Sequence, residues 1–345
     1  MRKENSTKRS NTLPASSKSI LRKNSSDITP FVRAFLKRVQ NTVTTESLWG
    51  KKEHFIIAVS GGADSLCLLD VLFLLSKKYD FKLHIAHVNY RLRQEDSALD
   101  EALVRERAAF YKLPLTVLHP KKTTSSNLEE KLRDIRYHFL ETVRKKEQAT
   151  LIAVAHHEDD QAETFLLRLL RGSGMTGLSA MRPKHGYIIR PLIKVSRQDI
   201  LRYLKERNIA YRTDGSNSDA KFLRNRLRHE LLPLLEKEYQ PKVRKILADT
   251  AALLASDYAI LETLSSPHTD TKEFSVQVLL ALPEPVLKTR LRFLLKPYYK
   301  GKAAPKGLIE EILKLLKSHK GKIQTLSFRG LKIERKGDTV RLLNF

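Results

Sequence analysis

The sequence predicts an α/β fold in which a parallel sheet is covered by helices on both faces, followed by a smaller C-terminal α+β module. Two observations support this prediction. Short apolar runs alternate with stretches of helical periodicity through the first half of the chain, and parallel strands need such helical crossovers. The last stretch instead alternates with a period of two around Lys336-Gly337-Asp338, which indicates a β-hairpin.

The first half begins with a helical stripe that runs from Phe31 to Val39. The apolar runs that predict strands after it are 55-FIIAV-59, 83-LHIAHV-88, 113-LPLTVL-118 and 151-LIAVA-155. Helices are expected at roughly 64–78, 96–112, 126–147 and 158–171. Ligands of parallel sheets bind beyond the carboxyl ends of the strands. Polar motifs that directly follow these runs should therefore meet at one edge of the sheet.

After Arg190-Pro191 the strand signals fade, and the chain becomes mainly helical. Segment 217–240, which carries Arg224, Arg226, Arg228 and Pro233, predicts a basic helix that ends in a turn. Further helices are expected near 243–264, 275–296 and 306–318. We therefore divide the chain into a tail at 1–30, an α/β domain at 31–240 and a C-terminal module at 241–345.

The tail carries seven Ser and seven Lys or Arg residues but few large apolar ones. Such a composition cannot bury enough surface to offset the entropy of ordering, so residues 1–30 are expected to be disordered. An organelle transit peptide is also rich in Arg and Ser, and this alternative stays open.

The formal charge of the chain is +26, which predicts a polyanionic partner. Nucleic acid is favoured over a membrane surface, because no apolar run approaches the ~20 residues of a spanning helix. The single cysteine, Cys67, excludes an intramolecular disulfide, a redox pair and a zinc site built from cysteines. A reducing, cytoplasmic setting is therefore expected.

A phosphate-binding loop is predicted directly after the first strand, where a helix begins. Two glycines let the backbone turn tightly, two serines add hydroxyl donors, and a helix N-terminus favours an anion. This is not a Walker loop, because an acidic residue stands where lysine would be expected. The alternative is an ordinary Gly-Gly turn. The loop residues expected to bind ATP are Ser60, Gly61, Gly62, Ala63, Asp64 and Ser65.

A second polar motif, 156-HHEDDQAET-164, follows the run 151–155 and should lie at the same edge of the sheet. We expect Asp64, Asp159 and Asp160 to hold Mg²⁺ against a triphosphate, where the ion offsets charge on the leaving pyrophosphate. The acidic residues could instead serve only the helix dipole, or the histidines could belong to a transition-metal site.

Arginines lie near both motifs. Asn89, Arg91 and Arg93 follow the second strand, while Glu129, Arg133 and Arg136 share one face of the third helix beside Tyr137. Solvated surface and a salt-bridged helix face are the alternatives. The glycine-rich stretch 171-RGSGMTGL-178 is compatible with a mobile lid or with an ordinary helix stop.

These motifs resemble the PP-loop ATP-pyrophosphatases, which have a Rossmann-like sheet, and more narrowly the tRNA(Ile)-lysidine synthases. The resemblance covers residues 50–235, and the C-terminal module only in size and outline. The sequence departs from the family where Tyr90 and Arg91 replace a usual His-Gly pair and Leu132 a usual alanine. The resemblance rests on the segments SGGADS, 86-AHVNYRLR-93, 129-EEKLRDIRY-137, 155-AHHEDDQAET-164, 171-RGSGMTGL-178, 190-RPLIKVSRQDI-200 and 214-DGSNSDAKFLRNRLRHELLP-233.

The resemblance implies a ligase that acts on the wobble cytidine of a tRNA(Ile) with a CAU anticodon. The C2 carbonyl oxygen would attack the α-phosphate of ATP and release pyrophosphate, and the ε-amine of free lysine would then displace AMP. The basic segment 221–229 and the C-terminal module would choose the tRNA. It implies catalytic roles for Asp64, Asp159, Asp160 and Arg133, substrate contacts for Asn89, Arg93, Arg136 and His156, and Asp64, Glu129, Asp134 or Glu163 as partners of the lysine amine.

Two other readings of the sequence remain. Another PP-loop enzyme is possible, such as a tRNA thiolase, an amidotransferase synthetase or an NAD synthetase, although thiolases generally need cysteine pairs. A non-catalytic basic RNA-binding protein would explain the charge. It would not explain why two phosphate- and metal-binding motifs converge at one edge of the sheet.

Overall fold

The computed structural model describes residues 28–92, 94–121, 128–212, 223–265, 272–299, 304–318, 322–328 and 331–344. The predicted tail therefore lies almost wholly outside the described residues. Within them the chain forms two compact units. Unit 1 comprises the described residues of Met1–Leu167 and Met181–Asp249, and unit 2 comprises those of Arg168–Ala180 and Thr250–Phe345. Helix α10, Val243–Ser265, runs through the second boundary. This boundary lies after residue 240, the division expected from the sequence, and because it falls inside a helix no loop-forming stretch marks it in the sequence.

Unit 1 contains a six-stranded sheet of order β3-β2-β1-β4-β6-β5. All pairs are parallel except β5 with β6, which confirms the predicted fold class. The sequence did not predict β5 and β6, because strands of two residues carry no periodic signal. The strands are β1 His54–Ala58, β2 Lys82–Val88, β3 Leu115–Leu118, β4 Leu151–Ala153, β5 Lys184–His185 and β6 Ile188–Ile189.

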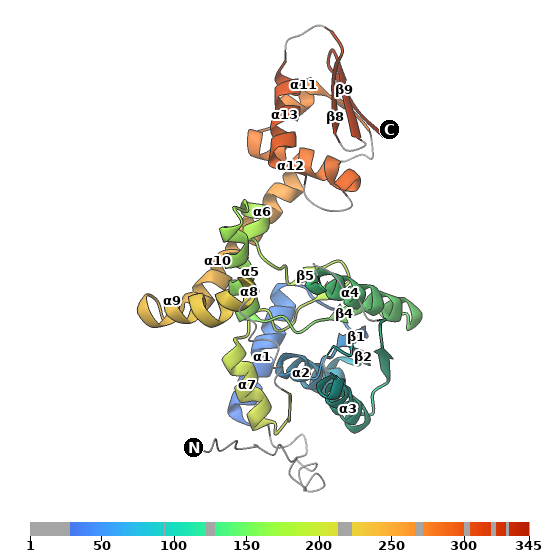
Figure 1. Cartoon of the computed structure of the whole chain (residues 1–345), viewed down its shortest axis with the longest axis vertical. Helices are drawn as coiled ribbons and strands as arrows, with labels where there is room; N and C mark the ends of the chain where they lie inside the picture. The colour runs from blue at the N-terminus through green and yellow to red at the C-terminus, as the bar shows by residue number, and fades with distance from the viewer. Residues whose placement is uncertain are drawn as a thin grey trace, which may run out of the picture. The chain divides into compact units, whose positions relative to one another are not determined.

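Helices cover both faces of this sheet because successive strand residues point to opposite sides. Phe55 and Ile57 of β1 pack in a core with residues of α1, α2, α3 and α7, whereas Ile56 packs with residues of α4 on the other face (Figure 1). The helices of the sheet region are α1 Pro30–Thr45, α2 Ala63–Tyr79, α3 Gln94–Tyr111, α4 Leu128–Lys146, α5 Glu158–Leu170 and α7 Arg197–Glu206.

A buried carboxylate fixes α7 against α2 and α3. Asp70 of α2 is 0% exposed, and its oxygens accept hydrogen bonds from the hydroxyls of Tyr111 at 2.8 Å and Tyr203 at 2.6 Å. The Nε of Arg207, just after α7, donates to it at 2.9 Å. A buried charge is tolerated only when it is paired and hydrogen-bonded, so this network sets the position of α7.

The predicted basic helix is present in the described part of 217–240 as α8 Leu223–Arg226, a π-helical turn Leu227–Leu231 and α9 Leu232–Glu238. In unit 2 the single helix expected at 275–296 is divided at Pro283, because a proline has no N–H to continue a helix. Unit 2 contains α6 Met175–Leu178, α11 Val276–Leu280, α12 Glu284–Leu295, a 3₁₀ turn Lys296–Tyr299 and α13 Lys306–Lys317.

The sheet of unit 2 has four strands in the order β7-β10-β9-β8, and every pair is antiparallel. The predicted hairpin is confirmed as β9 and β10. Helices α11, α12 and α13 pack in one core with this sheet. The strands are β7 Glu273–Ser275, β8 Gln324–Phe328, β9 Leu331–Lys336 and β10 Thr339–Asn344.

Candidate active site

The loop after β1 is held in shape by hydrogen bonds that its own serines make. The backbone N–H of Ser60 donates to the hydroxyl of Ser65 at 3.1 Å, and that hydroxyl donates to the carbonyl of Gly62 at 2.9 Å. Gly61 has φ +94°, and a Cβ there would lie 3.3 Å from the carbonyl oxygen of Asp100. Gly62 caps α2 without a side-chain hydrogen bond, so the N-terminus of this helix is available to an anion.

A pocket of about 250 Å³, which we call the loop pocket, opens beside this loop. Its lining is partly polar and partly apolar, which suits a nucleotide with charged phosphates and a flat base. The polar part is lined by Ser60, Gly62, Asp64, Ser65, Arg136, His156 and Asp160. The remaining lining is Ala58, Val59, Ala86, Val88, Tyr90, Tyr137, Leu140, Val154 and Ala155.

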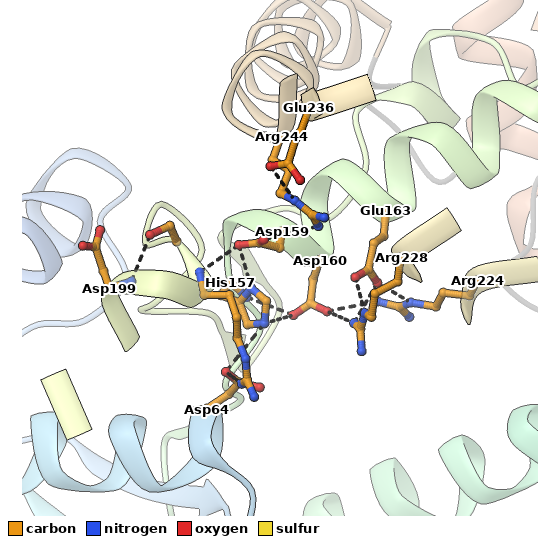
Figure 2. Close-up of polar contacts among 12 residues, drawn as sticks. Asp64, His157, Asp159, Asp160, Glu163, Asp199, Arg224, Arg228, Glu236 and Arg244 are labelled. Carbon is orange, nitrogen blue, oxygen red and sulfur yellow. Dashed lines mark hydrogen bonds and ion pairs between the residues drawn. The ribbon is translucent and has the colours of Figure 1, made fainter. Parts of the chain in front are cut away.

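The acidic motif surrounds one histidine (Figure 2). The Nε2 of His157 lies 3.6 Å from Asp64 Oδ1 and 3.4 Å from Asp160 Oδ2, and its Nδ1 lies 3.6 Å from Asp159 Oδ2. Burial alone would lower the pKa of His157, but the charges of Asp160, Asp159 and Asp64 outweigh it and raise that pKa. The three carboxylates of the loop and of α5 thus favour the cationic form of this imidazole.

Two arginines of the predicted basic segment close the other side of this cluster (Figure 2). The Nε of Arg224 and the Nη2 of Arg228 donate to Glu163 Oε2 at 2.9 and 2.8 Å, and both guanidinium groups also reach Asp160 Oδ1. Glu163 is 1% exposed. These arginines neutralise buried carboxylates, which the pattern of basic residues did not predict.

A second pocket of about 690 Å³ lies next to the loop pocket, and Asp64 lines both. Arg197, the first residue of α7, lines the second pocket and bonds to Asp64 through Nη1, while its backbone N–H donates to Asp159 Oδ2 at 2.8 Å. The wall mixes both charges. Its ionisable residues are Asp64, His157, Glu158, Asp159, Glu163, Arg197, Arg228, His229, Glu236, Lys242, Arg244 and Lys245.

Asp159 differs from the other two predicted metal ligands because it lines only the second pocket of the two. Burial tends to raise its pKa, but the bonds from His157 and the backbone of Arg197 lower that pKa to about 2. Its Oδ1 lies 3.4 Å from Arg244. Asp160 lines the loop pocket together with Asp64. Among the residues that the structure describes, no three His, Cys, Asp or Glu side chains are arranged to hold a metal ion.

His156 lines the loop pocket as a neutral imidazole. Burial lowers its pKa to about 3, and the nearby Arg190 contributes in the same direction. The Nε of Arg190 donates to His156 Nδ1 at 3.2 Å. That bond requires the proton of His156 to be on Nε2, so this nitrogen is a hydrogen-bond donor.

The rim arginines of α4 lie in different places. Arg136 lines the loop pocket, whereas Arg133 is exposed and its guanidinium lies 4.9 Å from the ring centre of Tyr137. Tyr90, at the position of the family's usual histidine, also lines the pocket, and its hydroxyl donates to the carbonyl of Leu132 at 2.8 Å. This bond ties the end of β2 to α4.

Asn89 does not line the loop pocket. Its amide donates to Glu101 Oε2 at 2.8 Å, and its Oδ1 accepts from the backbone N–H of Arg91. Arg91 has φ +53°, a conformation that glycine adopts without strain, which explains why the family usually has glycine there. Arg93, another predicted substrate contact, lies outside the described residues.

Cys67 is buried in α2. No helix in the described part of the chain is long and apolar enough to cross a membrane.

Comparison with known families gives a match to the PP-loop domain over residues 30–235. Among curated proteins, a tRNA(Ile)-lysidine synthase from Geobacter sulfurreducens is 42% identical over 240 residues, which cover 68% of this chain and 50% of that protein. One from Caldanaerobacter subterraneus is 32% identical over 295 residues, or 81% of this chain and 63% of that protein. The matched part thus spans between half and just under two thirds of these relatives.

Among solved structures, the chain is similar to the U34-tRNA thiolase NcsA from Methanococcus maripaludis. The TM-score is 0.55 at 18% identity, and the match covers 66% of this chain and 79% of the thiolase. At that identity the likeness establishes the fold of the sheet domain and carries no conclusion about the reaction.

Proposed function

Because this chain belongs to the PP-loop family, we propose that it uses ATP to attach lysine to the wobble cytidine of a tRNA(Ile) with the anticodon CAU, giving lysidine. Relatives named tRNA(Ile)-lysidine synthase, up to 42% identical, support the proposal. The observation that supports it within the molecule is that the loop pocket and a larger pocket lined by ionisable residues share one carboxylate, Asp64.

ATP would bind in the loop pocket. Its phosphates would accept hydrogen bonds from the free N–H groups at the start of α2 and from the hydroxyls of Ser60 and Ser65. The base would lie against the apolar lining, which includes Val88, Leu140 and Val154. This arrangement directs the α-phosphate toward the remaining polar side chains of the pocket, Arg136 and His156.

The carboxylates fit Mg²⁺ as a partner of bound ATP. Asp64 and Asp160 both line the loop pocket and lie within 3.6 Å of the same nitrogen of His157. Magnesium usually takes one or two carboxylates together with substrate phosphates and water rather than an all-protein cage. When bound, the ion would offset the charge of the leaving pyrophosphate. Asp159 would support the pair from the second pocket.

The reaction would proceed in two steps. The C2 carbonyl oxygen of the cytidine attacks the α-phosphorus of ATP, and the bond to pyrophosphate breaks. The ε-amine of lysine then attacks C2, the bond from C2 to oxygen breaks, and AMP leaves. The neutral His156 would donate a hydrogen bond from Nε2 to a phosphate oxygen. No step needs a nucleophile from the protein.

Free lysine would bind in the second pocket. Its carboxylate matches the basic residues of the wall, and its ammonium matches acidic ones such as Asp64. With a reference pKa near 10.4, only about one lysine amine in 10³ is neutral at pH 7. A carboxylate that holds the amine beside the reacting cytidine therefore serves both binding and proton removal.

The tRNA would bind through charge. The net charge of +26 favours a polyanion. Arg136, which lines the loop pocket, and the exposed Arg133 on the same helix would contact a cytidine flipped out of the anticodon loop. Unit 2 and the exposed Arg226 are candidates for contacts elsewhere on the tRNA. An enzyme with this substrate would act in the cytoplasm.

The test is mass spectrometry of a CAU-anticodon tRNA(Ile) transcript after incubation with the protein, ATP, Mg²⁺ and lysine. The expected result is a lysine-sized mass gain on the wobble cytidine that is absent with Asp64→Asn. Pyrophosphate release without lysine incorporation would assign the protein to another adenylating enzyme of the family. No ATP-dependent product at all would contradict the proposal.

A further inference from the structure

Arg197 connects the two pockets. It lines the second pocket, yet its guanidinium bonds to Asp64, whose side chain also lines the loop pocket. Its backbone N–H is held separately, by Asp159 Oδ2 at 2.8 Å. The main chain and the side chain of one residue are thus bound to two different carboxylates.

The helix that carries Arg197 is fixed, whereas the side chain is free to change partner. The hydroxyl of Ser196 caps α7 by accepting from the N–H of Asp199 at 3.1 Å, and Asp70 holds the other end through Tyr203. The side chain of Arg197 is 37% exposed. A rotation of this side chain therefore needs no movement of the helix.

A bound nucleotide with its metal ion would change the charges that surround Asp64. In the structure the guanidinium of Arg197 bonds to this carboxylate, and His157 Nε2 lies 3.6 Å from its Oδ1. A divalent cation on Asp64 would stand beside the guanidinium, and like charges at that separation repel. A triphosphate adds negative charge and acceptor oxygens within the adjoining pocket, and a planar guanidinium binds phosphate oxygens in pairs.

We propose that Arg197 is a movable counter-cation, which holds Asp64 while the loop pocket is empty and transfers to the phosphates when ATP and Mg²⁺ bind. In the nucleotide-free protein it keeps the carboxylate neutralised. In the complex it is a substrate-binding residue. The inference rests on the proposed use of Mg²⁺ and ATP at the loop pocket and does not depend on the second substrate.

Two binding measurements on Arg197→Ala test the proposal. Mn²⁺ alone, titrated without nucleotide and followed by electron paramagnetic resonance of the free ion, should bind about three- to tenfold more tightly, because Asp64 has lost a competing cation. ATP in the presence of Mg²⁺, followed by calorimetry, should bind about tenfold more weakly, because a charged hydrogen bond to phosphate is lost. A general loosening of the site would weaken both ligands.

Two further variants complete the test. Arg38→Ala removes a 2.7 Å ion pair to Asp199 of the same helix, outside both pockets, and should change neither affinity. Arg197→Lys keeps the charge, so Mn²⁺ affinity should return to that of the parent while ATP affinity recovers only in part. Weaker Mn²⁺ binding or unchanged ATP binding in Arg197→Ala would overturn the proposal. Failure of the parent to bind ATP would instead overturn the proposed function.

Discussion

The loop pocket and the second pocket share Asp64 but are built in different ways. The loop is six consecutive residues held by their own hydroxyls and by one glycine in a left-handed conformation. The second pocket depends on a hydrogen bond from α7 to α5 and on ion pairs that join α5 to α8 and to the π-helical turn after it, and these segments are distant in sequence. A local motif thus encodes the phosphate loop of the first pocket, whereas the ion pairs of the second exist only once the tertiary structure has formed.

The largest effect should come from breaking the ion pairs of the second pocket. Glu163→Gln removes the buried carboxylate to which Arg224 and Arg228 both bond, and leaves them with contacts to Asp160 Oδ1 at 3.2 and 3.3 Å. Removing one member of a buried pair typically costs about 3 to 5 kcal/mol. Because both arginines are about 30% exposed, we expect a loss of about 2 to 3 kcal/mol in urea unfolding.

The matched control is Glu230→Gln. Glu230 pairs with Arg226 at 3.6 Å, and both side chains are more than half exposed. Exposed pairs contribute about 0 to 1 kcal/mol, so this variant should unfold like the parent. Equal losses for Glu163→Gln and Glu230→Gln would mean that the buried cluster does not stabilise unit 1.

Gly61→Ala should reduce stability less than Glu163→Gln does, but it should specifically weaken the binding of ATP. The left-handed conformation costs about 1 to 2 kcal/mol for a residue with a Cβ, and this Cβ would press on the backbone of Asp100 at 3.3 Å. We therefore expect calorimetry to give a roughly tenfold weaker ATP affinity.

Gly186→Ala is the control for Gly61→Ala. Gly186 lies in the β5–β6 turn, also has positive φ, and has nothing within 4 Å of an added Cβ. It should lose a similar stability without losing ATP affinity. If both variants bound ATP equally well, the close approach at Gly61 would have no role in binding.

The smallest effect is a pH dependence of stability that comes from His157, which lines the second pocket but not the loop pocket. A raised pKa means that His157 stabilises the folded state fully below its ordinary value of 6.5 and loses this contribution as pH rises through the folded-state pKa. Each unit by which the pKa is raised contributes about 1.4 kcal/mol. The stability difference between parent and His157→Gln, measured by urea unfolding without Mg²⁺, should therefore shrink from pH 6 to pH 9. A difference that is independent of pH would contradict a cationic His157.

Some site residues could be read from the sequence and others could not. Ser60–Ser65 and the acidic start of α5 follow directly after strands, so their meeting at one sheet edge was predictable. Arg197 is preceded only by an ordinary capping serine, and nothing local indicates that its side chain reaches Asp64. Asn89 shows the opposite case, since its place at the edge was predicted but its amide is bonded to Glu101.

The sequence by itself determined the alternation of strands and helices, the phosphate loop and the acidic motif, because hydrophobic periodicity and glycine placement act over a few neighbouring residues. Only the tertiary structure decided how the charged residues pair. Arg224 and Arg228 pair with Glu163, and His157 lies among three carboxylates. Asp159 lines the second pocket but not the loop pocket. The physical reason is that an ion pair depends on a few ångströms between side chains from distant segments, a distance that no local pattern contains.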